Sequence, residues 1–234
     1  MSETPAHRGK RVLALIPAYD AAHLLPPVVA EARTHLPVLV VDDGSADDTA
    51  SAAEAAGATV LRQAPNQGKG AALRAGFGRA LDDGFDAVLT LDADGQHDPR
   101  EIPAFLDAYE RTRADLIIGA REFGRMPALR RAANTLGRRA FSWAVGQPIR
   151  DNQSGYRLIT RRLMEDTLAS GESGFEFEVE MIVTCLEHGY RLEWVPIRTI
   201  YAGEGSHIRP LHHLRHFVRV VLQTRRRMRR GRRS

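Results

Sequence analysis

The sequence has few of the features that mark secreted, membrane-spanning or repetitive proteins. It contains one cysteine, Cys185, in an apolar stretch, which predicts a core residue of a protein from a reducing compartment. No run approaches the roughly 18 apolar residues of a spanning helix, and the N-terminal apolar run, 12–16, is too short for a signal peptide. Repeats and low-complexity linkers are also absent. These absences favour a cytoplasmic protein.

The order of apolar and helical segments predicts an α/β fold. At 234 residues, the chain is long enough for one such domain with a full core. The run 38–41 is apolar without polar alternation, as expected of a strand buried on both faces. Further apolar strands at 11–16 and 87–91 alternate with helical stretches, including an alanine-rich one at 50–56. The pattern predicts a mostly parallel sheet flanked by helices.

Two carboxylates, Asp92 and Asp94, follow the strand predicted at 87–91. In an extended chain, residues i and i+2 face the same side, so both side chains can reach one ion. Carboxylates around an open site suit Mg²⁺ or Mn²⁺, which leave positions free for substrate phosphates. The alternative is a polar loop, because Asp and Gly are ordinary turn residues and the pattern is short.

A second acidic cluster, Asp42 and Asp43, ends the strand predicted at 38–41. In open α/β sheets, ligands bind beyond the carboxyl ends of the strands, where both clusters fall. Asp47 or Asp48 is better explained as a cap of the following helix.

Lys69 lies between two glycines, where a helix is predicted to begin. Backbone N–H groups, the helix dipole and the ammonium group would all favour a phosphate there. The segment is not a Walker A loop, because it lacks the four-residue spacer and the Ser or Thr after the lysine.

Taken together, the motifs resemble the family 2 glycosyltransferases of the GT-A fold, from about Arg11 to about His216. The most similar branch is that of the dolichyl-phosphate mannosyltransferases, which act on polyprenyl phosphates. The motifs, in chain order, are IPAYDAAHLL, VVDDGSADDT, NQGKGAALRAGF, LTLDADGQHDP, GAREFG, DNQSGYRLI and FEFEVEM. Seven motifs in order are far more specific than any one of them.

The resemblance implies a set of site residues. The donor would be bound by Pro17, Ala18, Tyr19, Asp42, Asp43, Lys69, Ala93 and Gln96. The metal would be held by Asp92 and Asp94. The acceptor would be bound by Arg121, Arg131, Ser154, Arg157, Glu180 and His207. Arg121 and Arg157 would also assist catalysis, because the arginine fork pairs two phosphate oxygens at once.

The implied activity is metal-dependent, inverting transfer of a hexose from a UDP- or GDP-sugar to a polyprenyl phosphate or similar lipid. An ionised phosphate needs no general base, whereas a hydroxyl acceptor, on another lipid or a carbohydrate, would need one, and Asp151 is the candidate. A third reading is a non-catalytic nucleotide-binding member of the family. A nucleotidyltransferase is disfavoured, because it would carry a glycine-rich loop after the first strand.

Two positions depart from the family pattern. Asp20-Ala21 stands where relatives usually carry Asn-Glu, so the choice of donor base is open. His207 stands where polyprenyl-phosphate enzymes tend to have a lysine, and its charge would titrate near neutrality.

The positive charge is concentrated at the end of the chain. The net charge is +4, yet residues 225–234 include seven arginines and no acid, so the rest carries −3. Apolar residues recur at helical spacing before it, which predicts an amphipathic helix and basic tail at 210–234. Such a helix suits the anionic inner face of the cell membrane; solvent exposure is the main alternative, and no nucleic acid is expected. We expect a disordered segment at 1–10 and the catalytic domain at 11–209.

Overall fold

A seven-stranded sheet lies at the centre of the protein, with strand order β3-β2-β1-β4-β6-β5-β7. The computed structural model describes residues 9–121, 128–170, 177–198 and 210–231. The strands are β1 (Val12–Ala18), β2 (Val38–Asp43), β3 (Thr59–Gln63), β4 (Ala87–Thr90), β5 (Leu116–Arg121), β6 (Arg157–Thr160) and β7 (Leu192–Ile197). Every residue of β1 and β2 is buried, as the runs without polar alternation predicted.

The sheet is mostly parallel, which confirms the prediction. β1 pairs in parallel with β2 and β4, β2 with β3, and β5 with β7. The exception is β6, which runs antiparallel to both neighbours, β4 and β5. The first residue of β6, Arg157, therefore lies at the edge where the parallel strands end.

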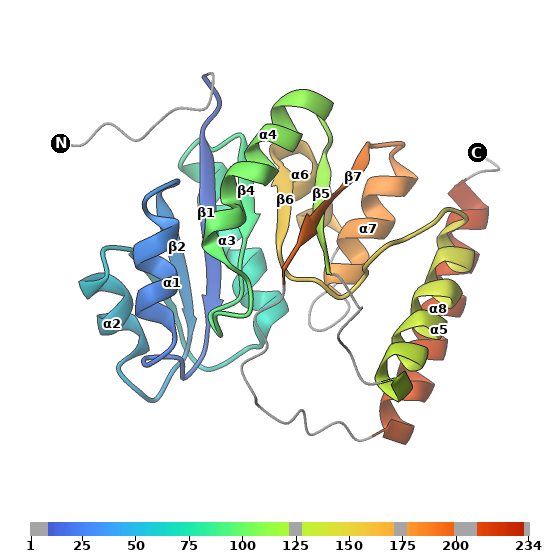
Figure 1. Ribbon diagram of the computed structural model, residues 1–234, viewed down its shortest axis with the longest axis horizontal. Coiled ribbons are helices and arrows are strands. Elements are labelled where there is room, and N and C mark those ends of the chain that lie inside the picture. Colours follow the sequence, from blue (N-terminus) through green and yellow to red (C-terminus); the bar gives the residue numbers. More distant parts are fainter. Residues whose placement is uncertain (1–8, 122–127, 171–176, 199–209, 232–234) are drawn as a thin grey trace.

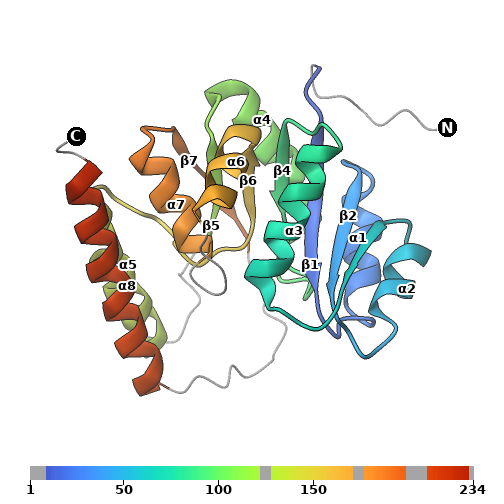
Figure 2. The same cartoon turned by 180° about the vertical axis from the view of Figure 1, so that it is seen from behind.

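Helices cover both faces of the sheet. They are α1 (Leu25–Ala32), α2 (Thr49–Ala55), α3 (Lys69–Asp82), α4 (Ile102–Thr112), α5 (Ala128–Val145), α6 (Arg161–Ala169), α7 (Phe177–Glu187) and α8 (Pro210–Gly231), with a 3₁₀ turn at Pro99–Glu101. Helices α1 and α4 pack on one face (Figure 1), and α3, α6 and α7 pack on the other (Figure 2).

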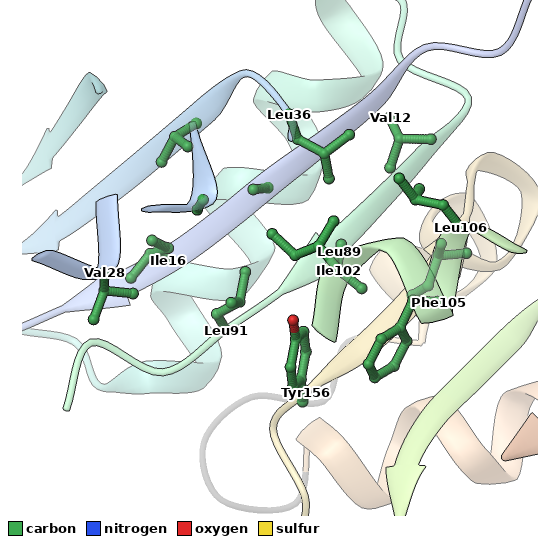
Figure 3. Packing of buried hydrophobic residues seen from close by; sticks show 14 of the residues in the cluster. Val12, Ile16, Val28, Leu36, Leu89, Leu91, Ile102, Phe105, Leu106 and Tyr156 are labelled. Carbon is green, nitrogen blue, oxygen red and sulfur yellow. The ribbon is translucent and has the colours of Figure 1, made fainter. Parts of the chain in front are cut away.

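Each face has its own apolar core. On the α1 and α4 side, Tyr156 stacks on Phe105 with ring centroids 4.4 Å apart, below the strand residues (Figure 3). On the opposite side, Cys185 of α7 is fully buried, which confirms the prediction of a core cysteine. Burial of side chains from both faces of the sheet holds the strand ends, and hence the site, in fixed positions.

Helix α8 packs along α5 and contacts α7, beside the β7 edge of the sheet (Figure 1). Val220, Val221 and Met228 are buried in this contact layer, so part of the predicted amphipathic helix faces the protein. Within the described helices, none combines the length and apolarity needed to cross a bilayer.

Candidate active site

The acidic strand ends predicted to form a site lie at one edge of the sheet. In the register of β1 and β2, Ala18 is opposite Asp42, and in that of β1 and β4, Leu15 is opposite Thr90. Because these strands are parallel, the residues that follow them emerge at the same edge. Figure 1 shows this edge at the bottom of the sheet. Arg121 ends β5 on the same side.

Lys69 is the centre of the charged cluster at this edge. Its Nζ lies 2.6 Å from Oδ1 of Asp92 and 2.9 Å from Oε1 of Glu178. Burial alone would lower the pKa of Lys69, but the two carboxylates raise it, so the ammonium stays charged. Burial would likewise raise the pKa of Asp92, but the ammonium of Lys69 holds it below its usual range. The cluster therefore keeps Lys69 and Asp92 ionised side by side.

Asp43 fixes the loop that carries Lys69. Its two carboxylate oxygens accept hydrogen bonds from the backbone N–H groups of Gln67, at 2.9 Å, and Gly68, at 2.6 Å. Gly68, the residue before α3, has φ = 90°, a conformation that favours glycine. Asp42 accepts from the backbone and hydroxyl of Ser45. Asp42 and Asp43, which were predicted to bind the sugar donor, are both buried; Asp42 bonds within the loop that follows β2, and Asp43 bonds to the loop before α3.

Replacing Asp43 with Ala should weaken donor binding, because Lys69 would lose its fixed approach to the site. Two backbone donors would lose a charged acceptor, so the free energy of unfolding should also fall by about 1.5–3 kcal/mol. Calorimetric titration with the nucleotide and urea unfolding measure the two effects. Asp48→Ala is the matched control, because that exposed side chain makes no capping hydrogen bond. Unchanged donor affinity in Asp43→Ala would contradict this role.

Asp92 and Asp94 differ in their surroundings. Asp94 is exposed, and its Oδ1 accepts from the backbone N–H of Gln96 at 2.9 Å. Asp92 is half-buried, and its backbone N–H donates to Nδ1 of His97 at 3.3 Å. His97 is buried beside Tyr156, and burial lowers its pKa, so a neutral ring can accept this bond. Ala93, predicted at the donor, is buried between the two acids.

The donor atoms at this loop fit a hard divalent cation. Asp92 and Asp94 offer carboxylate oxygens, and Gln96 offers an amide oxygen nearby in the chain. Among the described residues, no group of three or more His, Cys, Asp or Glu side chains converges on one point. A site with two carboxylates and open positions suits Mg²⁺ or Mn²⁺, which bind substrate phosphates and water as well.

The end of β1 forms the side of the site nearest β2. Pro17 and Ala18 are buried in the strand, whereas the ring of Tyr19 is 52% exposed and is available to a ligand. Asp47 caps the first turn of α2 by accepting from the backbone N–H of Thr49 at 3.0 Å, as predicted for Asp47 or Asp48.

Arg121 and Asp151 form a two-point ion pair. Nε of Arg121 lies 2.6 Å from Oδ2 of Asp151, and a terminal nitrogen donates to Oδ1 at 3.0 Å. Asp151 also accepts from the backbone N–H groups of Gln153 and Ser154. Burial would raise the pKa of Asp151, but Arg121 holds it below its usual range. The proposal of Asp151 as a general base does not fit this geometry, because both carboxylate oxygens are paired with Arg121 and the lowered pKa makes the group a weak base.

Arg157 lies in the interior, which differs from the position expected of a phosphate contact. Its side chain is fully buried, and it donates to the carbonyl oxygens of Asn152, Ser154 and Glu178. Ser154, predicted at the acceptor, is buried too. The reason is the reversed direction of β6, which brings Arg157 between the 151–156 loop and the start of α7. Arg157 therefore holds the loop of Asp151 against the helix of Glu178.

Of the remaining predicted acceptor residues, Glu180 is not brought to the cluster. Glu180 faces α8, where its Oε1 accepts from Arg227 at 2.7 Å and from Thr184 at 3.2 Å. The backbone of Arg131 belongs to α5, and its side chain lies outside the described residues, as does all of His207.

Three residues of the cluster were missed in the sequence. Glu178 is one of three acids in the FEFEVE segment, and nothing in its spacing distinguishes it from Glu180. His97 lies three residues after Asp94, the second of the two predicted metal ligands, and this closeness was the signal available in the sequence. Gly155 lies against the cluster, so that a Cβ there would be 2.8 Å from both carboxylate oxygens of Asp92.

The sequence is similar to that of known proteins. The family model described as Glycosyl transferase family 2 matches residues 14–168. The undecaprenyl-phosphate mannosyltransferase of Micrococcus luteus is 35% identical over 214 residues, 84% of this chain and 86% of that protein. The polyprenol monophosphomannose synthase of Mycolicibacterium smegmatis is 32% identical over 208 residues, 80% of this chain and 77% of that protein.

A solved structure shows the same fold. Glucosyl-3-phosphoglycerate synthase from Mycobacterium tuberculosis, in complex with Mn²⁺, uridine diphosphate and glucosyl-3-phosphoglycerate, superposes with a TM-score of 0.65 at 20% identity. The match covers 93% of this chain and 79% of that chain.

Proposed function

Because the chain belongs to glycosyl transferase family 2 and has the GT-A fold, we propose that it transfers a hexose from a UDP- or GDP-sugar to a polyprenyl phosphate. The observation that carries the proposal is the meeting of Asp92, Lys69 and the Arg121–Asp151 pair at one sheet edge. The two curated relatives compared above act, by their names, on polyprenyl phosphates, which supports this acceptor class.

The donor half of the site neutralises a diphosphate. Asp92 and Asp94 would hold Mg²⁺ or Mn²⁺, which supplies Lewis-acid stabilisation of the departing diphosphate when bound. Lys69 adds a fixed positive charge beside Asp92, and Glu178 keeps that ammonium in place. Asp43 positions the loop before Lys69, and Tyr19 offers an exposed ring to the nucleoside.

The acceptor half brings a second anion close to the first. Arg121 is held in place by Asp151 and is 20% exposed at its side chain, so its positive charge is positioned beside the acceptor phosphate without first being ordered. The acceptor phosphate is already ionised at pH 7 and attacks the anomeric carbon directly, which inverts that centre. A hydroxyl acceptor has less support, because the candidate base Asp151 is committed to Arg121.

The proposed location is the cytoplasmic face of the membrane, where the enzyme would be a peripheral protein bound to the bilayer surface. The acceptor of the proposed reaction is a lipid phosphate, so the site must reach the lipid headgroups. The positive charge of α8 supports this placement.

The test is a transfer assay with a panel of UDP- and GDP-hexoses, Mg²⁺ or Mn²⁺, and either a polyprenyl phosphate or the matching polyprenol. We expect a glycosylated lipid phosphate of inverted anomeric configuration, detected by mass spectrometry and NMR, and no product in excess chelator. Product from the alcohol alone would favour the hydroxyl acceptor, and product in excess chelator would exclude the metal role.

A further inference from the structure

Positive charge in this protein is concentrated on one layer of two helices, α5 and α8. Together these helices carry eleven arginines and no Asp or Glu. The rest of the chain therefore carries a net charge of −7, although the whole is +4. The two helices lie side by side at one end of the molecule in both views (Figures 1 and 2).

The same layer exposes large apolar side chains. Of the five large hydrophobic residues that are exposed in the described part of the chain, three lie here: Leu136 at 71%, Trp143 at 53% and Leu222 at 47%. Leu136 and Trp143 are seven residues apart on α5, which places them two turns apart on the same face. Exposed apolar residues among arginines are typical of helices that lie in a membrane interface.

A concave site of about 710 Å³ lies in this layer. Its lining includes Arg138, Arg139, Arg150 and Arg225, together with Trp143. The guanidinium of Arg225 lies 4.9 Å from the centre of the Trp143 ring and donates to the Trp143 carbonyl oxygen at 3.0 Å. Its Nε is buried and, among the described residues, has no hydrogen-bond partner. A buried, unmatched donor beside other arginines indicates an anion site.

We propose that the outer face of α5 and α8 docks on an anionic membrane and that this pocket receives the phosphate group of a lipid headgroup. Charge complementarity selects the occupant, because the two helices carry many arginines and contain no acid that would repel a phosphate. Tryptophan suits the water–lipid boundary, where its ring meets the acyl region and its N–H the headgroups. The proposal rests on the lipid acceptor proposed above and names the surface that reaches it.

The inner face of α8 is already used within the protein. Arg227 binds Glu180 and Glu187 of α7, both through 2.7–2.8 Å ion pairs, and Val221 is buried. Arg227 and Val221 belong to the segment that the sequence analysis predicted to face the membrane. In the structure, these two residues instead hold α8 against the protein. Arg219, Leu222, Arg226 and Arg229 are exposed on the other side.

The docking face is connected to the catalytic edge through two elements. Helix α5 begins seven residues after Arg121, which is paired with Asp151. Helix α7, which holds Arg227 through Glu180 and Glu187, carries Glu178, which contacts Lys69. A membrane bound at α5 and α8 would thus be held at a fixed position relative to the site.

Vesicle flotation tests the surface. Wild-type protein should float with vesicles that contain phosphatidylglycerol, remain at the bottom with phosphatidylcholine alone, and detach in 1 M salt, where the Debye length is only about 3 Å. Arg139→Glu with Arg150→Glu reverses two exposed pocket arginines and should reduce the partition coefficient at least about tenfold. Arg79→Glu with Arg111→Glu is the control, because it makes the same charge change on α3 and α4.

Trp143 reports on insertion. Trp194→Phe leaves Trp143 as the only tryptophan, and brominated lipids in anionic vesicles should then quench its fluorescence. Transfer to a short, water-soluble acceptor phosphate should be unchanged in Arg139→Glu/Arg150→Glu, which separates docking from the proposed reaction. Equal loss of flotation in both double variants, flotation without quenching, or no flotation of the wild type would each overturn the proposal.

Discussion

An enzyme with Asp92 replaced by Asn is expected to lose sugar transfer by about a hundredfold or more while remaining folded. The change keeps the size of the side chain but removes the charge that a metal ion and Lys69 both require. Groups that stabilise developing negative charge in an active site typically contribute at least this much. Among the described residues, Lys69 would retain only Glu178, at 2.9 Å, as its counter-charge. The measurement is kcat with the preferred nucleotide-sugar, together with the affinity for Mn²⁺.

The control for this change is Asp107→Asn, on an exposed position of α4, which should have full activity. Excess chelator should reproduce the Asp92→Asn defect in the wild type, and added Mg²⁺ or Mn²⁺ should restore the wild type alone. Full activity of Asp92→Asn, with metal affinity equal to that of the wild type, would show that this carboxylate does not bind the ion.

Gly155→Ala should reduce transfer about a hundredfold, although it adds a single methyl group. The new Cβ would lie 2.8 Å from both carboxylate oxygens of Asp92 and 3.0 Å from Nζ of Lys69. The backbone of Gly155 is held by Thr90, whose hydroxyl donates to the Gly155 carbonyl oxygen at 2.6 Å. The two charged side chains must therefore move, and a displacement of about 1 Å at a reacting site can reduce the rate about a hundredfold.

Gly78→Ala provides the matched comparison, because a Cβ there meets nothing within 4 Å and α3 should gain up to about 1 kcal/mol of stability. Both variants are measured for transfer, metal affinity and melting temperature. If Gly155→Ala turns over donor at the wild-type rate, the side chains of Asp92 and Lys69 can move away from the new methyl group without loss of activity, which would contradict this prediction.

The framework of the fold could be predicted because its signals are local. Continuous apolar runs at β1 and β2 identify strands buried on both faces, and the acids that follow them mark the carboxyl edge of a parallel sheet. The reversal of β6 could not be predicted, because a four-residue strand with two apolar residues at its centre has the same pattern in either direction. That reversal accounts for the interior position of Arg157.

The site was predictable where a motif is contiguous and unpredictable where partners are distant in sequence. Asp92, Asp94 and Lys69 could be identified in their own segments. The pairing of Lys69 with Glu178, and of Arg227 with Glu180, depends on how α3, α7 and α8 pack. Three alternating acids in FEFEVE look equivalent in the sequence, and only tertiary contacts assign one to the catalytic edge and another to the C-terminal helix.

The single antiparallel strand also bears on how such an enzyme can diversify. The donor half of the site is built by segments that leave parallel strands, after β1, β2 and β4. Asp151, which orients Arg121, belongs instead to the segment that enters β6. Insertions or substitutions between α5 and β6 can therefore reshape the acceptor side while the nucleotide-sugar side keeps its loops. One ancestral donor site could in this way acquire successive acceptors, each selected by a different version of that entering segment.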